Sequence, residues 1–459
     1  MERKATGSFT ELDGETFYKI ADYDRMEDFF MTIASPTDVW NFCWSQGGVT
    51  AGRVNADFAF FPYYTADKVA DAKTCTGHYA AVAVRGADGK TAIWEPFAPL
   101  LCNTGARWAD DPQIARNLYK NANGSKVWFE EVNQGLGLTF RYGWASSAAF
   151  GLVRMAVVAD ISGKAREVTV LDGCRNIMPA CTDAKFQNDN SVLLDAYKQS
   201  DIDARANLAL FAVSSVVTDK AEPSEGLLAN VSWFTVPGPL FLAPDTPARF
   251  FAANGDAAAL RPGGRVKGER PSCFIVRQVT LAANGSEAWE QVFDAALSAP
   301  QVAALEERLA DRPAARRALL DDIAAGEELM NRYLRESDGV QRTNAAMTAT
   351  HHRANVMFNI MRGGFFVNDG RVDAPDFLAF VKSRDAAKLA PAQAALGELA
   401  GQTGLAKDAV MAKMAAASDP QLTRLALEYM PLTFSRRHGD PSRPWNRFNI
   451  RLLDADKKP

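Results

Sequence analysis

The first two-thirds of the sequence is a nearly continuous series of β-strand patterns, and this feature limits the fold more than any other. In the stretch 78–97, side chains such as Val82 and Val84 alternate between two faces before a turn at Asp88 and Gly89. Because strands follow one another with few helical segments between them, the sequence predicts a large antiparallel sandwich rather than β-α-β units. Six further strand-rich segments support this prediction: 126–144, 151–163, 165–173, 207–219, 227–236 and 273–285.

Two interruptions of the strand pattern are expected to be helical. One is a short insertion at 191–201. The pattern also changes near Glu287, and in the segments 301–313 and 314–338 apolar residues recur at helical spacing and predict two linker helices separated by Pro313. The predicted buried stripe of the second linker helix is Leu320, Ile323 and Met330.

Beyond Thr343 the chain is expected to stay helical. Asp373 is predicted to cap a helix that has Pro375 in its first turn, and Asp419 with Pro420 repeats the arrangement. A chain of 459 residues exceeds a single hydrophobic core, so several domains are expected. The predicted boundaries are 1–295 for a β-sandwich domain, 296–342 for a helical linker and 343–459 for a helical domain.

The charge balance argues against nucleic acid or a membrane as a partner. The chain has 51 lysines and arginines against 55 aspartates and glutamates, a net charge of -4. It therefore lacks the basic footprint that nucleic acid and anionic membranes attract. Residues 1–15 contain no apolar run, so no signal peptide is expected, and no apolar stretch is long enough to cross a bilayer. A cytoplasmic protein is predicted.

The cysteines and histidines predict neither a disulfide framework nor a metal site. None of the six cysteines belongs to a C-x-x-C pair, so free buried thiols are the simplest interpretation. Cys174 and Cys181 lie nearest to each other but have no histidine nearby to complete a metal site. His351 and His352 are adjacent, so on one helix they point to different faces and cannot chelate one ion together.

An arginine-rich run at 430–448 is the strongest candidate for a binding site. Gly439, Pro441 and Pro444 prevent this run from continuing as a helix. Guanidinium forks and an imidazole suit phosphate oxygens, while an indole stacks on a sugar ring. A salt-bridge network that braces the surrounding structure is the alternative interpretation. The candidate ligand-binding residues are Arg436, Arg437, His438, Asp440, Arg443, Trp445 and Asn446.

A second candidate site lies in the N-terminal strand region. The segment 45–53 contains two consecutive glycines that permit a tight backbone, and the segment 60–65 is aromatic. Arg53, Tyr63 and Tyr64 are candidates to line a sugar-binding cleft together. The alternative interpretation is a turn followed by aromatic side chains of the sandwich core.

The order of a sandwich, a linker and a helical domain resembles glycoside hydrolase family ninety-four, the cellobiose and chitobiose phosphorylases. Three segments carry the resemblance: 34–68, 351–381 and 432–450. The resemblance implies an antiparallel β super-sandwich of the galactose mutarotase-like type, a helical linker and the beginning of an (α/α)6 barrel. It also implies inverting phosphorolysis of β-linked glucosides, with inorganic phosphate as co-substrate and no other cofactor.

Such phosphorolysis needs a carboxylic acid that protonates the glycosidic oxygen while phosphate attacks the anomeric carbon from the opposite face. The family places an R-D-x-x-Q sugar-binding segment and the catalytic Asp further along the barrel, and neither motif is found before Pro459. The resemblance therefore predicts a chain without a catalytic residue, inactive alone and completed by the remainder of the barrel. It also implies an oligosaccharide substrate and a homodimer partner.

Two alternatives to this function stay open. A glycoside hydrolase of the same architecture would use water in place of phosphate. A non-catalytic carbohydrate-binding or assembly module would need neither a catalytic acid nor phosphate. The sequence fixes neither the sugar nor the linkage.

Overall fold

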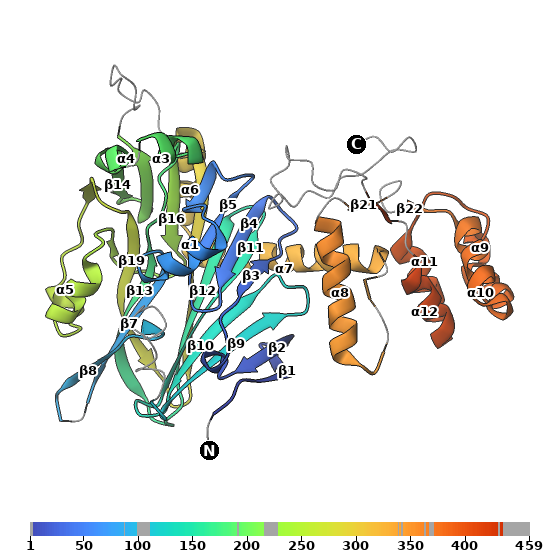
Figure 1. Cartoon of the computed structure of the whole chain (residues 1–459), viewed down its shortest axis with the longest axis horizontal. Coiled ribbons are helices and arrows are strands. Elements are labelled where there is room, and N and C mark those ends of the chain that lie inside the picture. The colour runs from blue at the N-terminus through green and yellow to red at the C-terminus, as the bar shows by residue number, and fades with distance from the viewer. Residues whose placement is uncertain are drawn as a thin grey trace. The chain divides into compact units, whose positions relative to one another are not determined.

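A computed structural model describes most of the chain and shows strands followed by helices (Figure 1). This order confirms the predicted β-then-α organisation. No helix in the part of the chain that it describes has the length and hydropathy of a membrane span. The described residues are 3–86, 88–98, 111–190, 192–214, 228–337, 339–340, 343–361, 364–366, 371–429 and 432–434.

Contacts divide the chain into two compact units, each with a hydrophobic core of its own. The boundary between them falls inside α7 (Arg312–Glu336), after Ile323. The first half of this helix is therefore part of the strand-rich unit. The first unit comprises Met1–Ala34, Val39–Asn121 and Ser125–Ile323, and the second comprises Ser35–Asp38, Ala122–Gly124 and Ala324–Pro459.

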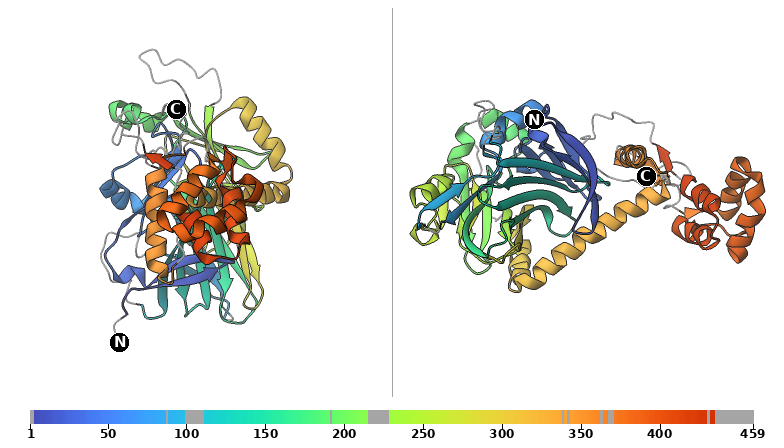
Figure 2. Two further views of the ribbon diagram at one scale, coloured as in Figure 1. Left: turned by 90° about the vertical axis from the view of Figure 1, so that its right-hand side faces the viewer. Right: turned by 90° about the horizontal axis from the view of Figure 1, so that it is seen from below.

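An eleven-stranded antiparallel sheet is the largest element of the first unit, and it curves around the core in the view from below (Figure 2). Two of its central strands, β11 (Leu138–Ser147) and β12 (Gly151–Asp160), pair along their whole lengths. In spatial order the sheet contains β1 (Thr6–Leu12), β2 (Glu15–Ala21), β9 (Ile114–Asn121), β10 (Val127–Asn133), β11, β12, β20 (Ser286–Ser298), β16 (Leu228–Phe234), β15 (Leu208–Val213), β14 (Lys198–Asp203) and β18 (Arg265–Lys267).

Two smaller sheets complete the strand-rich unit. The predicted hairpin is confirmed in one of them, because Val82 pairs with Trp94 across an antiparallel turn. The five-stranded sheet has the order β17 (Leu240–Phe241), β19 (Ser272–Leu281), β13 (Arg166–Arg175), β7 (Gly77–Arg85) and β8 (Thr91–Trp94). The four-stranded sheet has the order β3 (Phe30–Ile33), β4 (Val39–Trp44), β5 (Val49–Arg53) and β6 (Phe58–Phe61).

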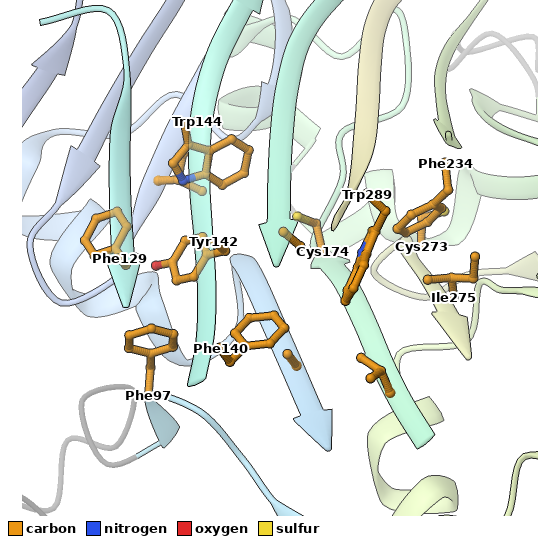
Figure 3. Close-up of a cluster of buried hydrophobic side chains, with 14 of the residues drawn as sticks. Phe97, Phe129, Phe140, Tyr142, Trp144, Cys174, Phe234, Cys273, Ile275 and Trp289 are labelled. Atoms are coloured by element: carbon orange, nitrogen blue, oxygen red, sulfur yellow. The ribbon is translucent and has the colours of Figure 1, made fainter. Parts of the chain in front are cut away.

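The three sheets enclose one core that is rich in aromatic side chains (Figure 3). Tyr142 stacks on Phe129 with ring centroids 4.9 Å apart, and the rings of Phe140 and Trp289 lie 6.5 Å apart. Burying one such side chain contributes about 1.5–3 kcal/mol. This core therefore stabilises the sandwich and joins strands that are distant in the sequence.

Short helices cover the outer surfaces of the strand-rich unit. α5 (Thr246–Ala252) packs on the outer face of the five-stranded sheet, where Phe250 contacts a second apolar cluster (Figure 1). Among the described residues, the other short helices outside the insertion are η1 (Tyr23–Arg25), α1 (Ala66–Asp71), η2 (Ala72–Thr74) and η3 (Ala257–Ala259).

The helical insertion exists but lies earlier than predicted. α3 (Ala184–Asn190) and α4 (Val192–Tyr197) form it, and β14 follows at once instead of a helix through residue 201. The buried side of β14 includes Lys198 and Ser200. A strand with polar side chains on its buried face shows no apolar alternation, so the sequence pattern did not reveal it.

Two helices follow the strands, α6 (Ala299–Leu309) and α7, as predicted. Pro313 is the second residue of α7 rather than a spacer between the helices, a position where its missing N–H costs little. The predicted stripe was wrong at Leu320, which is 42% exposed. Leu319 is buried in its place, because Leu319 and Ile323 form the face of α7 that packs on the large sheet.

Charged side chains anchor the first half of α7 to the sandwich. Arg316 donates two hydrogen bonds to the carboxylate of Glu290 on β20, at 2.8 and 2.9 Å. Arg312 donates to the backbone carbonyl of Asn207 at 3.1 Å and also to that of Phe234. Charge-assisted hydrogen bonds of this kind are stronger than neutral ones, so this part of the helix is fixed on the sheet.

The second unit is helical and its helices share a small core around Phe377, Val381 and Leu425. Asp419 caps α12 as predicted, because its carboxylate accepts from the backbone N–H of Gln421 at 2.9 Å. Asp373 occupies the N-cap of α9, but its carboxylate accepts from another loop instead. The elements are α8 (Ala346–Met361), α9 (Ala374–Arg384), η5 (Ala386–Lys388), α10 (Leu389–Leu396), η6 (Gly397–Leu399), α11 (Lys407–Ala416), α12 (Pro420–Glu428), and the strand pairs β21 (Gly364–Phe366) with β24 (Leu432–Phe434) and β22 (Arg371–Val372) with β23 (Leu405–Ala406).

Candidate functional site

The arginine-rich candidate site lies outside the described residues. The structure describes the chain up to β24, which ends at Phe434, and no residue after it. The ligand-binding role of this run therefore stays a prediction. The residues concerned are Arg436, Arg437, His438, Asp440, Arg443, Trp445 and Asn446.

The structure places Arg53 and Tyr63 on opposite faces of β5. Arg53 ends this strand, and its side chain reaches Asp294 on β20. The ring of Tyr63 packs edge-on against Trp40, with centroids 5.4 Å apart. A Cβ atom on Gly52 would meet this same indole at 2.5 Å. Because neighbouring residues of a strand point to opposite faces, Arg53 points away from Trp40 and Tyr63.

The two candidate tyrosines also have different surroundings. Tyr64 is 36% exposed and interacts electrostatically with Asp195 and Arg270. Burial raises the pKa of both the Tyr63 and the Tyr64 hydroxyls above the usual value. Both hydroxyls are therefore protonated at neutral pH and can donate hydrogen bonds.

An ion pair that joins two sheets holds the side chain of Arg53. Its Nε donates to Asp294 Oδ1 at 2.7 Å, and its Nη2 donates to the carbonyl of Ala148 at 3.0 Å. The two charged side chains are 16% and 21% exposed, so the surrounding protein shields the pair partly from water. Such shielding makes an ion pair stronger than one on an open surface.

Strained backbone lies next to both partners of this ion pair. Val54 follows Arg53 with φ 56°, and Ala296 lies two residues after Asp294 with φ 54°. Residues other than glycine rarely adopt this left-handed region, and β-branched valine does so least readily. Each such residue costs on the order of 1–3 kcal/mol, and strain of this kind concentrates at functional sites.

A β-bulge in β20 aims the carboxylate of Asp294. The pairing of β16 with β20 shifts register between Ala229 and Val231. The buried side chain of Asn230 fixes the bulge, because its Oδ1 accepts from the backbone N–H of Ala296 at 2.9 Å. Its Nδ2 donates to the carbonyl of Met178 at 2.7 Å and to that of Ala59 at 3.1 Å. Bulges of this kind redirect side chains near binding sites.

A cavity of about 420 Å³ opens beside the ion pair, between the bulged strand and α6. Its inner wall is apolar and buried, and its rim is charged or polar. The guanidinium of Arg308 lies over the ring of Phe150, 4.1 Å from the ring centroid. The lining residues are Arg53, Ala149, Phe150, Trp233, Asp294, Ala295, Leu297, Gln301, Ala304, Leu305 and Arg308.

The lining of this cavity suits binding rather than glycoside cleavage. Asp294 is the single carboxylate among its described lining residues, whereas cleavage of a glycosidic bond by hydrolysis uses a pair of them. Two guanidinium groups, one carboxamide and this carboxylate can instead hold hydroxyl groups and an anion. Among all described residues, no group of three His, Cys, Asp or Glu side chains is arranged to hold a metal ion.

A buried charged cluster in the core was not predicted from the sequence. Arg154 of β12 donates to both carboxylate oxygens of Asp172 on β13, at 2.7 and 2.5 Å, and so links the two main sheets. Trp289 Nε1 donates to the same carboxylate at 2.7 Å. The other partner of Arg154 is His78 Nδ1, at 2.7 Å. Desolvation first, and then the positive charges of Arg154 and Arg175, hold the pKa of His78 well below 6.5.

A second buried network lies toward the other end of the large sheet. Glu131 accepts from Arg116 Nε at 2.7 Å and from Trp94 Nε1 at 2.8 Å. Arg116 also donates to Asp24 at 2.9 Å. These charged groups are almost fully buried and bond to one another, so they tie η1 to β9 and β10.

Comparisons with known proteins find no matching protein family and no matching curated protein. Solved structures with a similar arrangement include a candidate kojibiose phosphorylase from the human microbiome, at 9% identity and a TM-score of 0.30 over 58% of this chain and 33% of that one. A bacterial glucoamylase in complex with acarbose shows 8% identity and a TM-score of 0.36 over 93% of this chain and 68% of that one. A galactose mutarotase-like protein from Clostridium acetobutylicum shows 10% identity and a TM-score of 0.27 over 63% and 98%.

These likenesses are remote. The matched part of this chain spans only about a third of the first of these structures. With TM-scores below 0.5, they carry no conclusion about the activity of this chain. The β-then-α architecture rests on the strands and helices themselves.

Proposed function

We propose that the chain is part of a carbohydrate-active protein of the glycoside phosphorylase type. In this proposal the reaction is inverting phosphorolysis of a β-linked glucoside with inorganic phosphate. The chain supplies the sandwich, the linker helices and a loop that binds phosphate and sugar. A homodimer and a cytoplasmic location belong to the same proposal.

The order of folds is the observation that carries this proposal. An antiparallel sandwich comes first, α6 and the part of α7 up to Ile323 are packed on it, and a helical unit follows in the chain. The same order implied the phosphorylase family when it was combined with the segments 34–68, 351–381 and 432–450. Because many functions share one architecture, the chemistry has to be tested at the arginine-rich run itself.

Each residue of the proposed loop has a role that its chemistry allows. Arg436, Arg437 and Arg443 present planar forks that match two phosphate oxygens at once. His438 adds a further donor, and Trp445 offers a flat surface for a pyranose ring. Asp440 and Asn446 bind sugar hydroxyls in this proposal. None of the 459 residues is assigned as the catalytic acid, so the chain alone is expected to bind without turnover.

A carbohydrate-binding module is the second candidate function. The cavity beside Arg53 favours it, because this cavity offers several binding groups but a single carboxylate among its described lining residues. A glycoside hydrolase of the same architecture is the alternative within the enzyme class.

Product analysis and calorimetry separate these functions. The purified chain is incubated with β-linked disaccharides such as cellobiose and laminaribiose, with and without phosphate. Glucose 1-phosphate as product would indicate a phosphorylase but would contradict the expectation that this chain alone has no turnover, and glucose released without phosphate would support a hydrolase. Sugar binding without turnover that is weakened by Arg437→Ala and strengthened by phosphate supports a binding role for the arginine-rich run. Sugar binding that neither Arg437→Ala nor phosphate changes supports a carbohydrate-binding module. If the chain shows no binding and no turnover with any of these sugars, a carbohydrate function is refuted.

A further inference from the structure

We infer that the cavity beside Arg53 is a binding site for a sugar unit that carries an anionic group, such as a phosphate or a carboxylate. The cavity belongs to the first unit alone. The inference is independent of the phosphorylase proposal, because it uses only described side chains of this unit and none of the arginine-rich run.

The charges of the lining favour an anion. Asp294 offsets the charge of Arg53 through their ion pair, so Arg308 gives the lining a net positive charge. Arg308 is exposed, and the central carbon of its guanidinium lies over the ring of Phe150, 4.1 Å from the centroid. A stacked guanidinium keeps the N–H donors on its edge available, and this edge fits the paired oxygens of a phosphate or a carboxylate.

Gln301 presents hydrogen-bond donors to the same opening. Its Oε1 accepts from the backbone N–H of Ser298 at 2.9 Å and from the Ser298 hydroxyl at 2.7 Å, in the capping box of α6. The carbonyl end of the amide is therefore occupied by the helix cap. The NH₂ end is the one that can serve a ligand, as a donor to an anion or to a hydroxyl.

The inner wall and the size of the cavity suit one sugar ring. Trp233 and Phe150 are 1% and 3% exposed, and Leu297 and Leu305 extend the same apolar surface. A pyranose has an apolar C–H face that packs on such a surface, while its hydroxyls reach a polar rim. The cavity volume of about 420 Å³ lies at the lower end of the usual range for small-molecule sites, which is roughly 300–1,000 Å³.

The site is organised before any ligand arrives. Contacts with Asp294 and with the carbonyl of Ala148 fix Arg53, so a ligand does not have to order this side chain. The bulge near Asp294 holds Ala296 in the left-handed region of backbone conformation, and Val54, which follows Arg53, is also left-handed. Asp294 can accept hydrogen bonds from sugar hydroxyls at the same place.

Calorimetry on the full chain tests this inference with four probes: glucose 1-phosphate, glucuronate, glucose and inorganic phosphate. We expect both anionic sugars to bind, and glucose and inorganic phosphate each to bind about tenfold more weakly, because each lacks one half of the recognised chemistry. Affinity for the anionic sugars should fall as salt rises. If inorganic phosphate binds as tightly as glucose 1-phosphate, the site recognises an anion and not a sugar. If glucose binds as tightly as the anionic sugars, the site does not recognise the anionic group. Either result would contradict the inference.

Variants locate the binding in this cavity. Arg308→Gln should weaken both anionic sugars about tenfold, and Ala304→Trp should abolish their binding by filling the opening. Both positions are exposed on α6, so the fold tolerates the changes. Arg317→Gln removes an exposed arginine of α7 outside the lining, and it should leave affinity unchanged. Unaltered affinity in both cavity variants, or equal loss in Arg317→Gln, would overturn the inference.

Discussion

The buried histidine of the core makes stability depend on pH in a direction that the structure fixes. Arg154 can only donate, so the contact with it makes His78 Nδ1 an acceptor and leaves the proton on Nε2. Desolvation and the neighbouring guanidiniums hold the pKa of His78 well below its usual 6.5. The folded protein therefore keeps this imidazole neutral in a pH range where the unfolded chain already binds a proton. The stability that this neutral imidazole contributes is therefore present above the unfolded pKa of about 6.5 and is lost as the pH falls below it.

The size of the effect follows from linkage. For a histidine with an unfolded pKa of 6.5 that stays neutral in the folded state, the free energy of unfolding falls by about 1.4 kcal/mol between pH 7.5 and pH 5.5. Most of this loss occurs between pH 6.5 and 5.5. His78→Asn keeps an acceptor for Arg154 but does not titrate, so this variant should lose that much less stability over the same range.

Urea unfolding at pH 7.5, 6.5 and 5.5, followed by tryptophan fluorescence, measures this difference. Trp144 and Trp289 are buried in the sandwich core, so the signal reports the unit that contains His78. His351→Asn is the matched control, because His351 is exposed on α8. The reasoning fails if His78→Asn keeps the full pH dependence of the parent protein, or if the control removes it.

Three further predictions concern the sandwich, the linker and the arginine-rich run. Asn230→Ala should lower the free energy of unfolding by about 1–3 kcal/mol, because the bulge loses its buried acceptor; chemical denaturation measures this, and an unchanged midpoint would mean that the bulge needs no anchor. Glu290→Gln should cost a similar amount and increase amide exchange in the first half of α7, whereas Glu307→Gln, an exposed control, should change neither. Arg437→Ala should weaken phosphate binding roughly ten- to hundredfold if the run binds phosphate; a lower melting temperature with unchanged phosphate binding would instead mean a structural role.

The sequence predicted those parts of the fold that depend on local periodicity. The hairpin around Asp88 and Gly89 was found because alternation and a turn signal coincide, and the cap at Asp419 because its chemistry is local. β14 was missed because Lys198 and Ser200 occupy its buried face. Leu320 was misplaced because it and Leu319 are adjacent, and only packing on the sheet shows which of the two is buried.

The candidate site was predicted only in part, for a different physical reason. Arg53 was predicted to line a sugar-binding cleft, and this role stays a prediction; its ion-pair partner Asp294 is 241 positions away in the sequence. Local sequence patterns do not predict a contact between strands of two different sheets. They also do not predict a bulge that one buried side chain, Asn230, holds in place. The buried pair of Arg154 and Asp172 escaped for the same reason, although an Asp on the inward face of an otherwise apolar strand is a signal that sequence reasoning could have used.

The cavity and the packing around it show that the predicted linker helices are part of the strand-rich unit. Sequence periodicity placed a domain boundary after residue 295, yet α6 begins only four residues later and supplies Gln301 and Arg308 to the cavity. The apolar face of α6 and of α7 up to Ile323 is buried in the same cluster as strand residues of the large sheet. A strand face that buries helix residues is as much a core as one that buries other strands. α6 and the part of α7 up to Ile323 therefore belong to the core of the strand-rich unit, although they follow its last strand in the sequence. The cavity lies where the bulged strand β20 meets α6.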